Sequence, residues 1–431
     1  MSTKLYFLVA AATLLLTAAS CGSRSSLSVD ATPALLLRDV RVVDVVQGRV
    51  SAPTDLRIEE GRIAAMGSDL SSSNASVREL DGHYVIPGLI DSHVHSTAGP
   101  EEAMVSALQR TLRGGVTRVR DMGGDGIVIR ERNTRARELS IPTVHFATVV
   151  AGPSWMTQDS RAEASAHGET PGTQAWLASA DGSTDVRALV HSAQQFRVDA
   201  LKLYADMDPE TVRALTTAAQ EEGLGVWGHA AIFPTSPMDA VRANVEVLSH
   251  AESLLFASDS TLPERYHDVR WGGRGSIDLD DDAFQDLLSA MSDQGTFLDA
   301  TLTVSAIRAA RGLADANHLA AVYDITRRAH EAGVRVLAGT DAMMLLGNPL
   351  PSLHGELELL VSNAGLSPAD ALRSATVHAA TMLGVGEDVG HIDVGLRADL
   401  VVLQEDPLQD IRATRGISLV VNNGVVVPDA P

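Results

Sequence analysis

The sequence has almost no cysteine, and it has fewer positively charged than negatively charged residues. Only Cys21 among its 431 residues is a cysteine, so no disulfide can form within the chain. Lysine and arginine number 34 against 55 aspartate and glutamate residues, which gives a formal net charge of −21. This excess of negative charge argues against nucleic acid and against anionic lipid surfaces as partners. The charge inside an active-site cleft is a separate matter that these totals do not address.

Long apolar runs are also scarce, and the clearest one lies near the beginning of the sequence. Lys4 precedes a mostly apolar run of about 15 residues, Leu5 to Ala19, which is short for a transmembrane helix. A positive start, an apolar run and small residues before a cleavage site are typical of a secretory signal. Ala18-Ala19-Ser20-Cys21 further resembles a lipobox with Cys21 as the lipidated residue, although Ala18 stands where leucine is commonest. We expect an exported lipoprotein on the periplasmic or outer face of a bacterial cell envelope, and ordinary cleavage to a soluble exported protein is the alternative.

The rest of the composition, with 45% apolar and 21% charged residues, is that of an ordinary globular protein. A chain of this length can bury one large core and a smaller one. Residues 1–21 are the expected signal segment, and the serine-rich residues 22–33 are the expected flexible tether. Short β-rich runs broken by glycine occupy residues 34–86 and recur in residues 386–431. These two ends are predicted to form one small β-sandwich domain, with residues 87–385 between them as the main domain.

The main domain alternates between strand-like and helix-like stretches. Eight candidate strands lie at residues 84–91, 116–122, 143–150, 200–204, 225–229, 245–250, 296–300 and 335–340. Repeated β-then-α units over roughly 250 residues have the size and rhythm of a TIM barrel. The stretch from Trp155 to Asp185 follows the third strand, has the composition of a loop and is expected to form a lid over the barrel mouth. The predicted fold class is therefore α/β, a (β/α)8 barrel with a small β-sandwich domain.

Six residues with metal-binding chemistry fall at the carboxyl ends of five predicted strands, where catalytic residues of such barrels lie. In strand order these residues are His93, His95, Lys202, His229, His250 and Asp341. Because residues i and i+2 of an extended strand point the same way, His93 and His95 can hold one metal ion together. Neutral imidazole is a common ligand for zinc, and Asp341 adds a hard, negatively charged oxygen. The pattern predicts a metal centre at the mouth of the barrel.

Lys202 needs a separate explanation in this company. A lysine ammonium beside two cations would be repelled, and burial would lower its pKa. A neutral lysine amine can react with carbon dioxide to give a carbamate, which is an anionic bridging ligand. Carboxylation would therefore explain why Lys202 stands among the predicted metal ligands.

The motifs around these residues resemble those of the amidohydrolase superfamily, in particular its imidazolonepropionase-like and prolidase-like members. The segment from Val85 to His95 is similar to the first-strand signature of that superfamily. The segment from Ala338 to Asp341 matches its strand-eight aspartate, and the segment from Gly395 to Val401 matches the part that re-enters the small β domain. Lys202, in the segment from Leu201 to Tyr204, matches the lysine that is carboxylated in binuclear members.

This resemblance implies two divalent metal ions, with Zn2+ as the expected metal, and a carboxylated lysine. The more buried ion would be held by His93, His95 and Asp341, and the more exposed one by His229 and His250. The carboxylate on the lysine and a hydroxide would bridge the two ions. The bridging hydroxide would attack the substrate carbonyl, while Asp341 acts as general acid and base toward the leaving amine.

The resemblance to exported prolidase-like members favours hydrolysis of an amide bond in a small substrate, either a dipeptide or an N-acyl amino acid. Such substrates carry a carboxylate, and Arg120 near the end of the second strand is the candidate cation, with a structural ion pair as its alternative role. Tyr204 lies two residues after Lys202 on the same strand face. It is a candidate for contact with the scissile carbonyl or a substrate carboxylate, or else packs against the next strand. His354 is a third candidate for the pocket lining.

Three other functions stay open at this point. A lactonase or esterase would use the same metal centre. A mononuclear deaminase or an imidazolonepropionase-type cyclic amide hydrolase is disfavoured by Lys202, because such sites lack a bridging carboxylate. A catalytically inactive, surface-anchored binding protein is disfavoured by the intact ligand set. The sequence leaves metal identity, side-chain preference and the existence of a homo-oligomer undecided.

Overall fold

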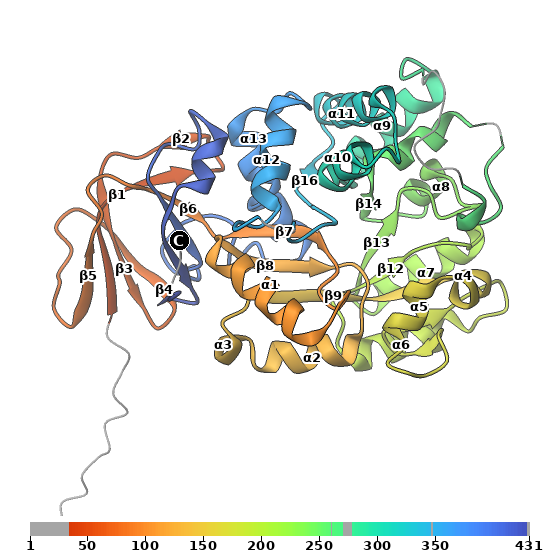
Figure 1. The fold of residues 1–431 in the computed structure, drawn as a ribbon, viewed down its shortest axis with the longest axis horizontal. Helices are drawn as coiled ribbons and strands as arrows, with labels where there is room; N and C mark the ends of the chain where they lie inside the picture. The colour runs from red at the N-terminus through yellow and green to blue at the C-terminus, as the bar shows by residue number, and fades with distance from the viewer. Residues whose placement is uncertain (1–33, 260, 270–277, 346–347, 429–431) are drawn as a thin grey trace, which may run out of the picture.

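A computed structural model describes residues 34–428 except 260, 270–277 and 346–347. The predicted signal segment, the lipidation site Cys21 and the tether 22–33 lie outside these described residues. Figure 1 shows a smaller sheet beside a larger barrel that helices surround. No helix in the described part of the chain has both the length and the apolar character needed to cross a membrane.

Strands from both ends of the chain build the smaller sheet. They are β1 (Ala34–Asp44), β2 (Arg49–Val50), β3 (Thr54–Glu59), β4 (Arg62–Gly67), β5 (Ala75–Glu79), β6 (Tyr84–Pro87), β17 (Leu400–Leu403), β18 (Ile417–Asn422) and β19 (Val425–Val426). The strand order is β19-β18-β17-β6-β1-β3-β4, with β2 and β5 paired to β1. Alternate residues of these strands, such as Leu35, Leu37, Leu56 and Val402, form its apolar core. The prediction that both chain ends form a small β domain is confirmed.

Eight parallel strands form the barrel. They are β7 (Leu89–Val94), β8 (Val116–Asp121), β9 (Thr143–Ala151), β12 (Ala200–Leu203), β13 (Gly225–His229), β14 (Val247–Ser249), β15 (Phe297–Asp299) and β16 (Val336–Leu337). Each pairs in parallel with the next one in this order. The backbone N–H of Ser92 donates to the carbonyl of Ala338 at 2.9 Å, and that of Asp341 donates to the carbonyl of His93 at 2.9 Å. These two bonds join the first strand to the last, so the predicted barrel is confirmed.

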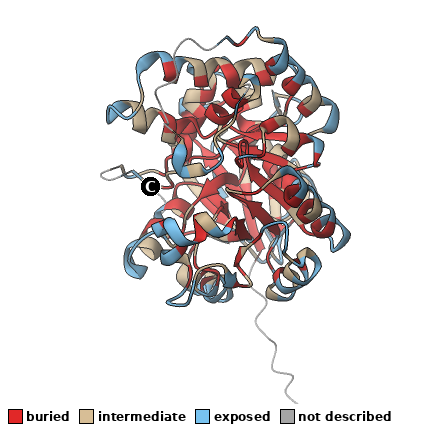
Figure 2. Ribbon diagram, turned by 90° about the vertical axis from the view of Figure 1, so that its right-hand side faces the viewer, coloured by how far each residue is buried: buried red, intermediate tan, exposed pale blue. Residues whose placement is uncertain are grey.

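Helices cover the outside of the barrel, and Figure 2 shows buried strands within a partly exposed helical layer. The α-helices are α1 (Glu101–Arg113), α2 (Gly126–Thr134), α3 (Ala136–Leu139), α4 (Pro153–Gln158), α5 (Ser160–Ser165), α6 (Val186–Phe196), α7 (Pro209–Glu221), α8 (Pro237–Arg242), α9 (Asp282–Gln294), α10 (Leu302–Ala310), α11 (Ala316–Glu331), α12 (Leu353–Ser362), α13 (Pro368–Ser374) and α14 (Val377–Met382). The 3₁₀ turns are η1 (Ala251–Ser258), η2 (Tyr266–Asp268) and η3 (Ile411–Arg415). Several helices begin after a residue whose side chain caps the helix N-terminus. For example, Asp208 accepts hydrogen bonds from the backbone N–H groups of Glu210 and Thr211 at the start of α7.

Two predicted elements differ from the structure. The first predicted strand, residues 84–91, is divided at Gly88, so that β6 belongs to the small sheet and only β7 belongs to the barrel. A Cβ atom at Gly88 would lie 2.3 Å from Thr117 Oγ1, so the chain crosses here at a distance that only glycine permits. The stretch from Trp155 to Asp185 is not a plain loop. It contains most of α4, all of α5 and the short strands β10 (Thr173–Gln174) and β11 (Leu177–Ser179), which pair beside β9.

A buried ion pair joins the barrel to the small sheet. Arg118 of β8 and Asp399, just before β17, are both buried, and Arg118 Nη2 lies 3.2 Å from Asp399 Oδ2. The other oxygen of Asp399 accepts a hydrogen bond of 2.7 Å from the backbone N–H of Asn423. Burial raises the pKa of Asp399, and the charge of Arg118 opposes that rise. The pair therefore holds two parts of the chain together that are far apart in the sequence.

Replacing Asp399 by alanine should destabilise the fold by about 3–5 kcal/mol, because it leaves the buried Arg118 guanidinium without its counter-charge. The measurement is the free energy of unfolding from urea titrations followed by circular dichroism. Asp410→Ala is the matched control, because Asp410 pairs with the exposed Arg412 and should contribute little. Equal urea midpoints for the two variants would contradict this account of the ion pair.

Candidate metal centre

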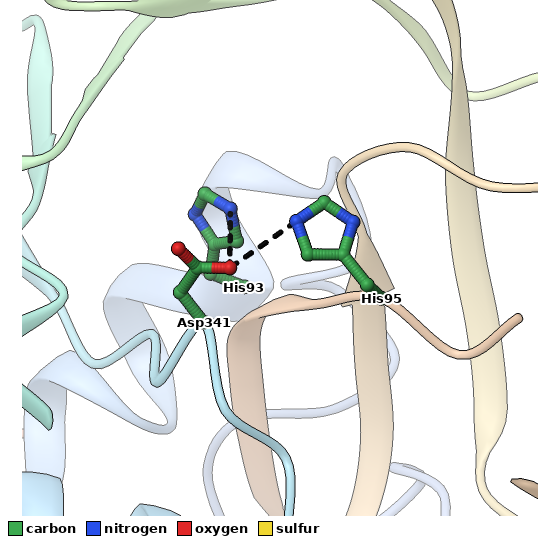
Figure 3. Close-up of side chains that lie close together, drawn as sticks. All are labelled: His93, His95 and Asp341. Carbon is green, nitrogen blue, oxygen red and sulfur yellow. Dashed lines mark ion pairs between the residues drawn. The ribbon is translucent and has the colours of Figure 1, made fainter. Parts of the chain in front are cut away.

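The ends of the first and last barrel strands bring three of the predicted ligands together. Figure 3 shows the carboxylate of Asp341 facing the imidazoles of His93 and His95. Asp341 Oδ1 lies 3.2 Å from His95 Nε2 and 3.7 Å from His93 Nε2. One potential ligand atom from each of these residues lies within 4.8 Å of the others. Two imidazoles and a carboxylate at this spacing form a donor set that suits zinc and similar metals.

His229 and His250 continue this cluster along the rim of the barrel. The ring centroid of His250 lies 4.9 Å from that of His93 and 4.8 Å from that of His229. The four histidines and Asp341 line one pocket of about 260 Å3. A larger cavity, of about 490 Å3, lies between the small sheet and helices α1 and α3, and none of the predicted ligands lines it. The predicted metal ligands that line a pocket therefore all line the smaller of the two.

Hydrogen bonds from the protein orient three of the four imidazole rings. The partners are Asp299 Oδ2 for His93 Nδ1 at 2.7 Å, the carbonyl of Gly123 for His95 Nδ1 at 2.8 Å, and Thr301 Oγ1 for His250 Nδ1 at 3.0 Å. The carboxylate of Asp299 and the carbonyl of Gly123 can only accept, so they fix the proton on Nδ1 of His93 and of His95 and leave Nε2 as the nitrogen for a cation. The hydroxyl of Thr301 can donate or accept, so it orients the ring of His250 without fixing its proton. This arrangement of outer hydrogen bonds is the one that metal-binding histidines require.

The protonation states of the cluster are compatible with a bound cation. Burial lowers the pKa of His93 and of His229, and it lowers the pKa of His250 to about 3, so these rings are neutral as metal binding requires. Burial also opposes the charge on His95, but the hydrogen bond and the negative charge of Asp341 raise the pKa of His95 to about 9. A cation between His95 and Asp341 would take the place of the proton that they share.

Lys202 is fully buried in the wall of the same barrel. Its Nζ donates a hydrogen bond of 3.1 Å to Ser249 Oγ. Burial, followed by the positive charge of Arg120, lowers the pKa of Lys202 to about 7. A large fraction of this amine is therefore neutral at neutral pH, which is the form that reacts with carbon dioxide.

The backbone adopts a rare conformation at three residues of this centre. His250, Thr301 and Asp341 have φ angles of 71°, 53° and 49°, in the left-handed region that side chains other than glycine seldom adopt. Each such residue costs of order 1–3 kcal/mol and persists only where its surroundings fix it. The cost falls on two predicted ligands and on the hydrogen-bond partner of one of them. Backbone strain of this kind is often found at functional sites, although positive φ angles also occur elsewhere in the described chain.

The three residues suggested as substrate contacts have different positions in the structure. Tyr204 lines the pocket, and its ring centroid lies 4.0 Å from that of His229. Arg120 does not line it. Its guanidinium is fully buried, donates from Nε to the carbonyl of Ser92, and contacts Asp299 Oδ2 from Nη2 at 2.9 Å. The alternative role of Arg120 as a structural ion pair is the one that its surroundings support.

His354 also lies outside this pocket. Its ring is fully buried, with Nε2 at 3.0 Å from the carbonyl of Gly114 and Nδ1 at 3.1 Å from Thr414 Oγ1. Burial lowers the pKa of His354 to about 4, so the ring is neutral. These contacts link α12 to the end of α1 and to η3. His354 therefore joins parts of the scaffold and does not face a substrate.

The sequence reasoning overlooked several residues that line or support this pocket. Asp299 stands at the end of β15, so the same rule of strand ends would have found it. Arg161 and Tyr266 line the pocket from α5 and η2, in connections between strands. Glu252 lines it from η1. No fixed spacing in the sequence marks residues in such connections.

Comparisons with known proteins bear on this site. A family model described as the amidohydrolase family matches residues 84–427. The imidazolonepropionase of Deinococcus deserti is 25% identical over 408 residues, which cover 84% of this chain and 88% of that protein. Adenine deaminase 1 of Jannaschia sp. is 41% identical over 68 residues, so the chain spans only 11% of that relative. The crystal structure of a Xaa-Pro dipeptidase with bound methionine has a TM-score of 0.71 at 21% identity, with 91% of this chain and 99% of that chain covered.

Replacing Asp299 by asparagine should weaken binding of Zn2+ about 10- to 100-fold, because His93 loses the carboxylate that orients its ring. The measurement is a competition titration with a chelator of known affinity. Asp286→Asn, at an exposed residue of α9, is the matched control. Circular dichroism of both metal-free variants checks that the fold is retained. Unchanged affinity in a folded Asp299→Asn protein would contradict the proposed support of His93.

Proposed function

Because this chain belongs to the amidohydrolase family and is a hydrolase of carbon–nitrogen bonds, we propose that it cleaves an amide bond in a dipeptide or an N-acyl amino acid with the help of two divalent metal ions. One observation carries the proposal. Four histidines and Asp341 converge on one pocket at the end of the barrel. Lys202 does not line that pocket, but it is buried beside it, has a lowered pKa, and is close enough for its charge to lower the pKa of His93, His229 and His250. Two divalent ions bound there, with Zn2+ as the expected metal, would polarise the amide carbonyl and lower the pKa of a water molecule.

The residues present fit such a pair of ions. His93, His95 and Asp341 would hold one ion, since their ligand atoms already lie within 4.8 Å of one another. The neighbouring rings of His229 and His250 would hold the second ion. Carboxylated Lys202 would contribute an anionic oxygen to both, which balances the positive charge that two ions bring into a buried site.

Asp341 would act as the general acid and base. Its carboxylate lies in the pocket, and the negative charge of Asp341 is favoured by the neighbouring His93 and His95, which lower its pKa although burial opposes this. It would accept the proton of the attacking water and deliver it to the nitrogen of the leaving amine. The backbone hydrogen bond from Asp341 to the carbonyl of His93 keeps the carboxylate in place between the two strands.

Two alternatives would use the same residues. A lactonase or esterase differs only in the bond that is cleaved. A mononuclear deaminase or imidazolonepropionase-type hydrolase finds support in the match to an imidazolonepropionase over most of the chain. The buried Lys202 favours the binuclear site over this second alternative. Export and lipidation at Cys21 remain predictions from the sequence.

A substrate panel tests the proposed reaction. Protein lacking residues 1–21 and loaded with Zn2+ should hydrolyse dipeptides or N-acyl amino acids, because the centre is arranged to polarise an amide carbonyl. Release of free amino acid is measured beside turnover of lactones and aryl esters. An Asp341→Asn variant is the inactive control. Clear ester or lactone turnover without any amide turnover would refute the choice of substrate bond.

Replacing Lys202 by alanine should reduce the bound metal from two ions to one and abolish most of the activity, since the bridging anion is lost. Metal content is measured by mass spectrometry of the dialysed protein. Reconstitution of metal-free wild type should also require bicarbonate and should decline as the pH falls below about 7. The pKa of Lys202 is about 7, so at lower pH its amine is protonated and cannot react with carbon dioxide. Full activity with one metal ion in Lys202→Ala would refute the binuclear site.

A further inference from the structure

One wall of the pocket holds an arginine whose orientation is fixed before any ligand binds. Arg161 of α5 donates to Asp159 from Nε at 2.8 Å and from Nη2 at 2.6 Å. Its Nη1 donates to the hydroxyl of Tyr204 at 2.7 Å. A guanidinium has five N–H donors, so these three bonds leave one N–H on each terminal nitrogen. Arg161 lines the pocket, and about half of its side chain is exposed to solvent (51%).

Aromatic rings hold this guanidinium from several sides. Its central carbon lies 5.8 Å from the ring centroid of Trp155, 5.3 Å from that of Tyr204 and 5.4 Å from that of Tyr266. Such contacts attract the cation to the ring faces and restrict its motion. A planar guanidinium fixed in this way is pre-organised for a carboxylate and loses little entropy on binding it.

Tyr204 adds a second donor at the same position. Its oxygen accepts the hydrogen bond from Arg161, so its own O–H can donate to a ligand in the pocket. The ring of Tyr204 lies 4.0 Å from that of His229, which the proposed function assigns to the metal centre. In an amino acid leaving group the carboxylate follows the scissile amide by one residue, a step of about 3.8 Å. An anion bound at Arg161 and Tyr204 therefore has its amide close to the reacting centre.

The other charged side chains of the pocket bear on which acyl group the substrate can carry. Glu252 lines the pocket, but Oε1 is 2.6 Å from Arg308 Nη1 and Oε2 is 3.0 Å from His318 Nε2. This carboxylate is thus already engaged by two basic side chains. Arg308 and His318 occupy both oxygens of Glu252, so a substrate ammonium group would have to compete with these two basic side chains for this carboxylate.

We propose that Arg161 and the hydroxyl of Tyr204 bind the α-carboxylate of the substrate, and that the acyl side of the substrate is uncharged. The substrates are then N-acyl amino acids in preference to dipeptides with a free amino group. The pocket volume of about 260 Å3 fits a small acyl group. This inference rests on the proposed function and chooses between the two substrate classes that it allows.

The test compares three matched substrates on wild type and on Arg161→Met. They are an N-acetyl amino acid, its carboxamide, and the glycyl dipeptide with the same C-terminal residue. Wild type should prefer the N-acetyl acid to both of the others. Arg161→Met should lower kcat/KM for the N-acetyl acid about 10- to 100-fold, mainly through KM, the size expected for a lost hydrogen bond to a charged group. Turnover of the carboxamide should change little, which a merely structural role for Arg161 would not produce.

Arg187→Met is the matched control, because Arg187 is exposed and pairs with Glu221 outside the pocket. Equal losses on the acid and on its carboxamide would overturn the role of Arg161, and a wild-type preference for the glycyl dipeptide would overturn the choice of acyl group. If wild type hydrolyses none of the three, the proposed function fails for these substrates. Calorimetric binding of the N-acetyl acid then decides the inference separately: weaker binding to Arg161→Met than to wild type supports the carboxylate site, and equal binding overturns it.

Discussion

A single buried carboxylate oxygen, Asp299 Oδ2, fixes the arrangement of the barrel centre. It lies 2.7 Å from His93 Nδ1, 2.9 Å from Arg120 Nη2 and 2.9 Å from Ser249 Oγ. These partners come from strands β7, β8 and β14, and Asp299 itself ends β15. An anion in a low-dielectric interior is stable only when its partners are in place, so this contact aligns four strand ends at once. The position of His93 in the proposed metal centre depends on that alignment.

The same network explains why a buried arginine and a buried lysine can share one barrel. Arg120 offsets the charge of Asp299, and its guanidinium also lies 4.8 Å from the ring centroid of Trp227. Its positive charge then disfavours a second cation nearby and contributes to the lowered pKa of Lys202. Ser249 contacts both Asp299 and the Lys202 amine. Burial and Arg120 together outweigh the carboxylates of Asp299 and Asp341, which act in the opposite direction, so the amine of Lys202 is disposed toward the neutral form that the proposed carbamate requires.

Sequence periodicity was sufficient to predict the barrel and to predict that most of the candidate metal ligands lie together, because the ends of parallel strands meet at one edge. It did not predict how deeply a side chain is buried, or to which of the two sheets a strand belongs. Arg120 follows the rule of strand ends, yet its side chain meets Asp299, which is 179 residues away in the sequence, and not a substrate. The run through Gly88 has a uniform β composition, so only the close approach to Thr117 reveals where the chain leaves one sheet for another. The contacts of Arg161 form between connecting segments, and no sequence periodicity relates residues of one such segment to those of another.

The strands and the connections between them contribute different residues to the site. The strands and the residues just after them supply the histidines and Asp299, whereas α5 and η2 supply Arg161 and Tyr266 to the wall of the pocket. Asp206, just after β12, anchors this wall, since its carboxylate accepts from the hydroxyl of Ser154 at 2.5 Å and from the backbone N–H of Tyr266 at 2.7 Å. Under the proposed function, substitutions in the connections could therefore change the recognised substrate while the strand ends keep the same predicted cation ligands. The fold itself is shared with a structure named as a Xaa-Pro dipeptidase at only 21% identity. If the proposed function holds, this separation makes the connections the part of this chain on which substrate choice depends.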